Sequence, residues 1–141
     1  MDRQLVFASL DQALRELDRL AQASTLKSTA AWTLPQTLVH CAQSIEYSLT
    51  GFPQPKSPLF QATAGALAFK AFAWRGRMRH DLAEPIPGAP ALAADTAVAA
   101  AMARLRQAVV DFHQTTQPLR PHFAYGELSK AEYEQAHAMH L

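Results

Sequence analysis

The chain has 141 residues, a formal charge of +1 and 49% hydrophobic residues, a composition typical of one globular domain with its own core. The near-zero charge and the absence of a continuous basic run argue against nucleic acid as a partner. The sequence has one cysteine, no apolar signal core after Met1 and no span of about 20 apolar residues. We therefore expect a single-domain protein over residues 1–141 that is cytoplasmic and does not enter a membrane.

Two helices are predicted in the first third of the chain. Between Asp2 and about Ala23, apolar residues recur at helical spacing with charged residues between them, which predicts an amphipathic helix. A second helix begins at Thr33, whose hydroxyl can accept a hydrogen bond from a first-turn N–H. Pro35 fits the first turn, and Gly51 can end the helix in a left-handed conformation.

The second predicted helix carries an apolar stripe and a polar strip. The stripe faces the core and consists of Leu34, Leu38, Cys41, Ile45 and Leu49. On this stripe we interpret Cys41 as a small hydrophobe. His40 lies off the stripe, on one side of the helix with Gln36, Gln43, Ser44 and Tyr47. That polar strip is either solvated or the wall of a polar site.

The middle of the chain is predicted to contain two more helices joined by a stiff turn. A helix from Pro58 to about Arg79 carries more apolar surface than one stripe needs, so it is central in the core or part of a subunit contact. Three prolines and a glycine between Glu84 and Pro90 exclude regular helix. Asp95 is predicted to cap the helix that follows.

A loop and a last helix complete the chain. We expect residues 118–128 to form a fixed loop packed on the bundle, in which a loop hydrogen bond is a better interpretation of His122 than a substrate contact. Ser129 and Glu132 form a capping box that starts the last helix. Because no segment alternates with period two for long enough to predict a strand, the predicted fold class is all-α.

Three histidines are candidate metal ligands. His40 lies on the second helix, and His137 and His140 lie three apart on one face of the last, so facing helices of a bundle could bring them together. Imidazole binds Zn, Ni, Cu or Fe, and three protein ligands with an open position make a catalytic metal site. From the chemistry alone, surface or hydrogen-bonded histidines are an equally good interpretation.

Four motifs together resemble the DinB/YfiT-like proteins, in particular one of their branches known only as a domain of unknown function. They are Trp32-x-x-x-Gln36-x-Leu38-x-His40, the Pro-Ile-Pro-Gly-Ala-Pro turn, the loop from His122 to Ser129 and the terminal histidine pair. The resemblance covers most of the chain from Trp32 onward. It implies a bacterial DinB-like four-helix bundle with an additional helix, commonly dimeric, that holds a divalent metal through three histidines.

The resemblance also implies which residues hold the metal. One family ligand maps to His40, and the other two form a His-x-x-x-His pair on the last core helix. Here Leu141 follows His137 by four residues, and Ala136 precedes His140 by four. Three alternatives remain: the third ligand lies beyond Leu141, His137 substitutes for it at the shorter spacing, or the protein binds no metal. We favour the first, in which the chain is truncated at its carboxyl end, with His40 and His140 as ligands and His137 as the further candidate.

The expected function is metal-dependent thiol transfer or hydrolysis of a small-molecule substrate in a homodimer. Zn²⁺ or Ni²⁺ is the expected metal, and a low-molecular-weight thiol is the further cofactor that the resemblance implies. The alternative is a non-catalytic helical module that dimerises or binds a small ligand. It is favoured by the surplus of Phe and Trp on the third predicted helix and by the incomplete histidine motif.

Overall fold

The computed structural model describes residues 5–23, 31–76 and 84–141. Apart from an isolated bridge between His122 and Gly126, the regular structure of these residues is helical, which confirms the all-α prediction. The elements in chain order are α1 (Leu10–Ala21), α2 (Leu34–Thr50), α3 (Pro58–Phe60), the π-helical turn η1 (Gln61–Gly65), α4 (Ala66–Arg75), α5 (Val98–Gln114) and α6 (Lys130–His140).

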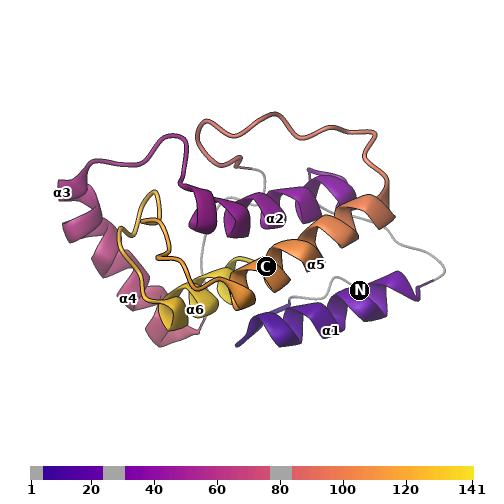
Figure 1. The fold of residues 1–141 in the computed structure, drawn as a ribbon, viewed down its shortest axis with the longest axis horizontal. Helices are drawn as coiled ribbons and strands as arrows, with labels where there is room; N and C mark the ends of the chain where they lie inside the picture. The colour runs from indigo at the N-terminus through magenta and orange to yellow at the C-terminus, as the bar shows by residue number, and fades with distance from the viewer. Residues whose placement is uncertain (1–4, 24–30, 77–83) are drawn as a thin grey trace.

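Four of the helices form a bundle. α2 packs most extensively against α5, α5 contacts α1, α1 contacts α6, and α6 contacts α2, which closes the ring. The continuous segment α3–η1–α4 lies outside this ring and contacts α6 through α4 (Figure 1). Residues 84–97 run alongside α2 to the start of α5 (Figure 1). The arrangement is the predicted four-helix bundle with an additional helix.

The main core lies between α1, α2 and α5, and Tyr133 of α6 joins it. Its buried side chains are Leu10, Leu17, Leu38, Val39, Cys41, Ala42, Ile45, Ala101, Met102, Leu105, Ala108, Val109, Phe112 and Tyr133. Phe69, Ala136 and Met139 form a smaller cluster between α4 and α6. Apolar side chains at helical spacing thus bury one face of each bundle helix, which supplies most of the stability of such a fold.

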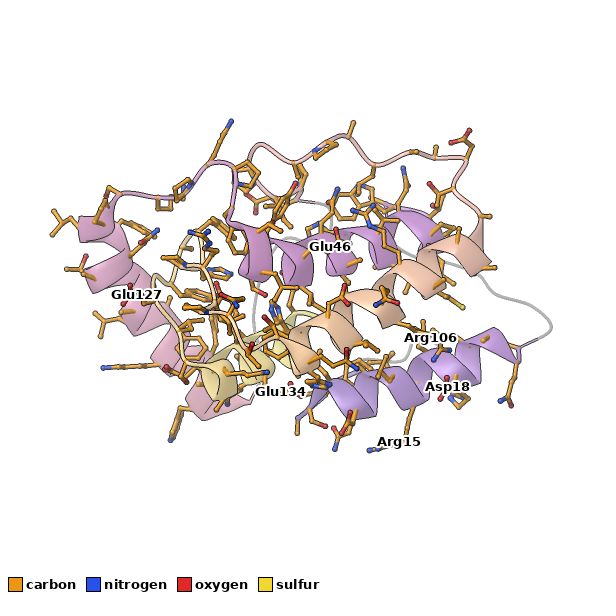
Figure 2. The ribbon with its side chains drawn as sticks, in the orientation of Figure 1. Arg15, Asp18, Glu46, Arg106, Glu127 and Glu134 are labelled. Carbon is orange, nitrogen blue, oxygen red and sulfur yellow. The ribbon has the colours of Figure 1, made fainter. Side chains whose placement is uncertain are left out.

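Polar contacts tie the ends of the bundle helices together. Glu134 of α6 accepts a hydrogen bond from the backbone N–H of Leu10 at 2.8 Å, and its other oxygen pairs with His113 Nε2 at 2.8 Å. Glu134 therefore links the start of α1 to the end of α5. Arg106 of α5 and Asp18 of α1 form a second link at 2.5 Å, and both are labelled in Figure 2.

The helix boundaries test the predicted caps. Thr33 with Gln36, and Ser129 with Glu132, form capping boxes, so both predicted starts are confirmed. Gly51 ends α2 with a positive φ of 105°, although its ψ of 138° is not that of a left-handed helix.

Two predicted helix starts are wrong. α1 begins at Leu10, behind a Ser9 cap, and residues 5–9, which the predicted helix included, are not helical. Asp95 lies in a turn and does not cap α5, whose N-cap is Ala97 without a side-chain hydrogen bond. The helix begins where Val98 starts to pack on the core, so burial rather than the capping preference of Asp95 sets this start.

The third predicted helix differs most from expectation. It runs from Pro58 to Arg75 through the π-helical turn and ends at Gly76, which has a left-handed φ of 71°. The predicted continuation to Arg79 lies outside the described residues. The segment is not central in the core, because Phe69 is buried but Leu59, Leu67 and Trp74 are 74%, 68% and 88% exposed. None of the described helices combines the length and apolarity needed to cross a membrane.

Candidate functional site

A cavity of about 180 Å³ lies where α2, α6, the turn at residues 84–87 and the loop at residues 122–125 meet. Four of the six histidines of the chain line it. The lining residues are His40 and Ser44 from α2, Ala136, His137 and His140 from α6, Glu84, Pro85, Ile86 and Pro87 from the turn, and His122, Phe123, Ala124 and Tyr125 from the loop.

The loop at residues 122–125 is fixed by backbone contacts at both ends. His122 and Gly126 exchange two backbone hydrogen bonds of 2.8 and 3.0 Å, and the positive φ of Gly126, 78°, permits the tight turn. The carbonyl of Phe123 accepts hydrogen bonds from the backbone N–H of Lys56 at 2.8 Å and from Gln61 Nε2 at 3.2 Å. The backbone N–H of Arg120 also donates to the carbonyl of Ser48 in α2 at 2.8 Å, which confirms the prediction of a fixed loop packed on the bundle.

His122 is the central side chain of this loop. Its Nδ1 accepts hydrogen bonds from the backbone N–H groups of Ala124 and Tyr125, both at 3.1 Å. The Tyr125 ring stacks on it, with centroids 4.2 Å apart and planes 9° apart. Burial lowers the pKa of His122 to about 3, so the ring is neutral at physiological pH. The predicted loop hydrogen bond is present, and the same ring also lines the cavity.

His40 and His140 meet across the interface of α2 and α6. Their Nε2 atoms are 3.1 Å apart, and their ring centroids are 4.9 Å apart. His40 is buried with the ring of Trp32 beside it, whereas His140 is half-buried. Of the two interpretations of the polar strip of α2, the structure supports the wall of a polar site at His40, because His40 and Ser44 of this strip are buried and line the cavity.

His137 makes a different set of contacts. Its Nε2 lies 3.1 Å from Ser48 Oγ, and the Ser48 hydroxyl donates to the carbonyl of Ile45 at 2.5 Å. The ring stacks on Tyr133 and meets Phe112 edge-on. Burial, and secondarily the proximity of His122, lowers the pKa of His137 to about 3. The ring is thus a neutral group whose Nε2 is committed to α2.

The structure brings together two of the three predicted ligands. His40 and His140 are in contact, and His137 lines the same cavity but bonds to Ser48. Among the residues that the structure describes, no group of three His, Cys, Asp or Glu side chains converges as metal ligands would. Cys41 is buried in the core, and burial raises the pKa of its thiol to about 12, in agreement with the packing interpretation.

Sequence reasoning missed two parts of this site. Ser44 was placed on the polar strip but not singled out, although its spacing of one helical turn from His40 puts both on the cavity wall. The turn Pro85–Pro87 was interpreted as a connector, yet it covers the cavity and buries Ile86. No local signal identifies such a cover, because a proline-rich turn has the same composition wherever it packs.

The model of the family described as "Protein of unknown function (DUF1569)" matches residues 1–141, so the chain belongs to this family. No curated protein and no solved structure matches the chain.

Proposed function

We propose that this DUF1569 chain is a metal-dependent enzyme of the DinB-like type, which carries out thiol transfer or hydrolysis on a small molecule held in the histidine-lined cavity. The observation that carries the proposal is the 3.1 Å approach of His40 Nε2 and His140 Nε2, from two helices, on the wall of that cavity. The resemblance of four motifs to DinB/YfiT-like proteins supports the same assignment.

The geometry of the pair fits two ligands of one metal. Metal–imidazole bonds of about 2.0–2.1 Å place two adjacent ligand nitrogens roughly 2.9 Å apart in octahedral geometry and roughly 3.3 Å apart in tetrahedral geometry. The observed 3.1 Å lies between these values. A direct Nε2–H···Nε2 hydrogen bond has a similar length, so the separation alone is compatible with both arrangements. Nitrogen ligands of this kind suit Zn²⁺ or Ni²⁺.

The chain's own residues define the rest of the proposed site. His40 and His140 would hold the metal, while the turn Pro85–Pro87 and the loop around His122 form the other walls of the cavity. A divalent metal supplies Lewis acidity, which lowers the pKa of a thiol or water at its open position. We interpret His137 as a residue of the cavity wall and not as a metal ligand, because its Nε2 is hydrogen-bonded to Ser48.

Metal content tests this proposal directly. The full-length protein, purified without a polyhistidine tag, should contain stoichiometric Zn²⁺ or Ni²⁺ by inductively coupled plasma mass spectrometry. His40→Ala and His140→Ala should each lose most of it. His113→Ala is the matched control, because His113 pairs with Glu134 on the surface and should leave the metal content unchanged. Absence of stoichiometric metal, or metal retained in both ligand variants, would overturn the proposal.

Dimerisation through the outer face of α3–η1–α4 is a second candidate function, alone or alongside the first. Leu59, Leu67 and Trp74 are largely exposed on this segment. The π-helical turn absorbs about one extra residue, which narrows the arc that holds Leu59, Leu67 and Trp74 from about 80° in a regular helix to roughly 40°. An aligned apolar face of this kind is typical of an interaction surface.

Sedimentation velocity distinguishes this second candidate. A dimer is expected for the unmodified protein, and Leu67→Lys should shift it to monomer because it places a charge within the apolar face. Val110→Lys, which changes an exposed apolar residue on α5, should leave the dimer intact. A monomeric protein at high concentration would exclude dimerisation.

A further inference from the structure

The cavity wall has three polar groups with unused hydrogen-bonding capacity. They are the hydroxyl of Ser44, Nε2 of His122 and Nδ1 of His137, and their residues are 7%, 8% and 2% exposed. None of these three atoms has a hydrogen-bond partner within residues 5–23, 31–76 and 84–141. Polar groups on the wall of a cavity pair either with water or with a ligand that has complementary groups, so these three atoms are the ones a polar ligand in the cavity would meet.

The hydrogen bonds of His122 fix which of its nitrogens carries the proton. Two backbone N–H groups, from Ala124 and Tyr125, donate to Nδ1, which must therefore present its lone pair. A neutral imidazole then carries its proton on Nε2. If Nδ1 were protonated as well, its N–H would point at two backbone N–H groups and none of the three would have an acceptor. The charged ring is therefore disfavoured, in agreement with the lowered pKa of His122. His122 consequently offers the cavity a hydrogen-bond donor.

The contacts of His137 fix the opposite arrangement. The Ser48 hydroxyl has one hydrogen, which it donates to Ile45 O at 2.5 Å. Ser48 Oγ can therefore only accept from His137 Nε2, 3.1 Å away, which places the His137 proton on Nε2. Its Nδ1 keeps a lone pair and offers the cavity a hydrogen-bond acceptor.

We propose that this wall recognises an uncharged carboxamide group of the substrate, whose oxygen accepts from His122 Nε2–H and whose N–H donates to His137 Nδ1. The Ser44 hydroxyl can either donate or accept beside them. A carboxylate has no hydrogen for Nδ1, and an ammonium has no acceptor for Nε2–H, so both would leave one ring nitrogen unpaired. The inference rests on the proposed function only in placing the substrate in this cavity.

The size of the cavity limits the ligand. A dry cavity of about 150 Å³ binds benzene, so a space of about 180 Å³ admits a ligand of roughly six to eight heavy atoms. Isobutyramide and isobutyrate both have six heavy atoms and nearly the same shape. They differ in the one group that the wall should distinguish, which makes them a matched pair of probes.

Nuclear magnetic resonance on the metal-free full-length protein, with ¹⁵N-labelled histidine, tests the proposal. The ring-nitrogen shifts should show the Nε2–H tautomer for both His122 and His137. Isobutyramide should bind saturably and shift both rings, with a dissociation constant at least about tenfold lower than that of isobutyrate. Omitting metal removes direct coordination of the carboxylate, which would otherwise mask the preference of the wall.

Two serine variants distinguish the effect of the His137 tautomer on binding from the effect of a direct contact between serine and the ligand. Ser48 does not line the cavity, so Ser48→Ala should leave its shape intact but free His137 to carry its proton on either nitrogen, and the preference for isobutyramide should fall several-fold. Ser44→Ala should weaken binding without changing either tautomer. The spectra of the unmodified protein remain decisive if Ser48→Ala does not fold.

The inference would be overturned by equal affinity for the two probes, by preference for isobutyrate, by no saturable binding of either, or by an Nδ1–H tautomer at either ring. The binding measurement is independent of the metal measurement. If the protein proves to contain no metal, an observed preference for isobutyramide still supports the inference, and if the preference is absent, the metal content still tests the proposed function.

Discussion

Gly65 holds the loop that carries His122 against the π-helical turn. Its φ of −65° and ψ of −45° are ordinary helical values, so backbone freedom is not what the position requires. What it requires is space: a Cβ at Gly65 would lie 1.7 Å from the carbonyl oxygen of Ala124. Because nonbonded carbon and oxygen atoms need about 3.3 Å, Gly65→Ala forces the loop to move by roughly 1.6 Å.

Two opposing effects decide the stability of this variant. Alanine in place of glycine inside a helix gains about 1 kcal/mol. Overpacking against a fixed backbone costs about 1–3 kcal/mol, and displacement also weakens the two hydrogen bonds that Phe123 O accepts, at about 1 kcal/mol each. The steric cost exceeds the gain in helix propensity. We expect Gly65→Ala to lower the free energy of unfolding by about 2 kcal/mol.

Urea unfolding followed by circular dichroism measures this change, and histidine resonances report whether the loop has moved. Gly76→Ala is the matched control, since its φ is 71° but an added Cβ meets no atom of the described part of the chain within 4 Å. It should lose stability through backbone strain alone and leave the resonances of His122 unchanged. The reasoning is refuted if Gly65→Ala is as stable as the unmodified protein and the His122 resonances do not shift.

Three further predictions concern buried groups. The pKa of His122 is lowered to about 3, so between about pH 6 and 3 its ring is protonated in the unfolded chain but not in the folded protein. Its contribution to stability therefore falls by about 1.4 kcal/mol for each unit by which the pH is lowered, and His137, whose pKa is lowered to about 3 as well, acts in the same direction. Urea unfolding across this range should give a shallower dependence for His122→Phe; equal slopes would contradict the assignment. Tyr133→Phe removes a hydroxyl that donates to Arg120 O at 2.5 Å and should cost about 1–2 kcal/mol in the same assay, whereas an unchanged midpoint would show that water replaces the bond. His137→Gln should retain stoichiometric metal by mass spectrometry, because the Nε2 of His137 is engaged by Ser48; loss of the metal would make His137 the third ligand.

Helix starts were predictable where the signal was local and complete. The capping boxes at Thr33 and Ser129 each close within three residues, so the sequence contains both partners. Asp95 has the side chain of a cap but no reciprocal Glu or Gln three residues later, and α5 begins instead where Val98 packs on the core. The predicted start of α1 was wrong for a related reason, because the helical spacing of apolar residues continues through residues 5–9, which precede the helix.

The candidate site was predictable only in part. Helical geometry placed His40 on a polar strip, and the resemblance joined it to His140, with which it is in contact. Whether that strip was solvated depended on its cover, which comes from the turn Pro85–Pro87 and from the loop around His122. Both segments lie more than 40 residues from His40 in the chain, and periodicity says nothing about which segment packs over which.

The sequence by itself determined the all-α class, the start of α2 and α6, and the set of histidines from which a site could be built, because propensity, capping and periodicity act between near neighbours. The tertiary structure alone decided how the histidines that line the cavity are used. His137 bonds to Ser48, 89 residues away, and not to the pair formed by His40 and His140. That choice sets the proton position on the ring, and it depends on how α2 and α6 pack, which no local pattern encodes.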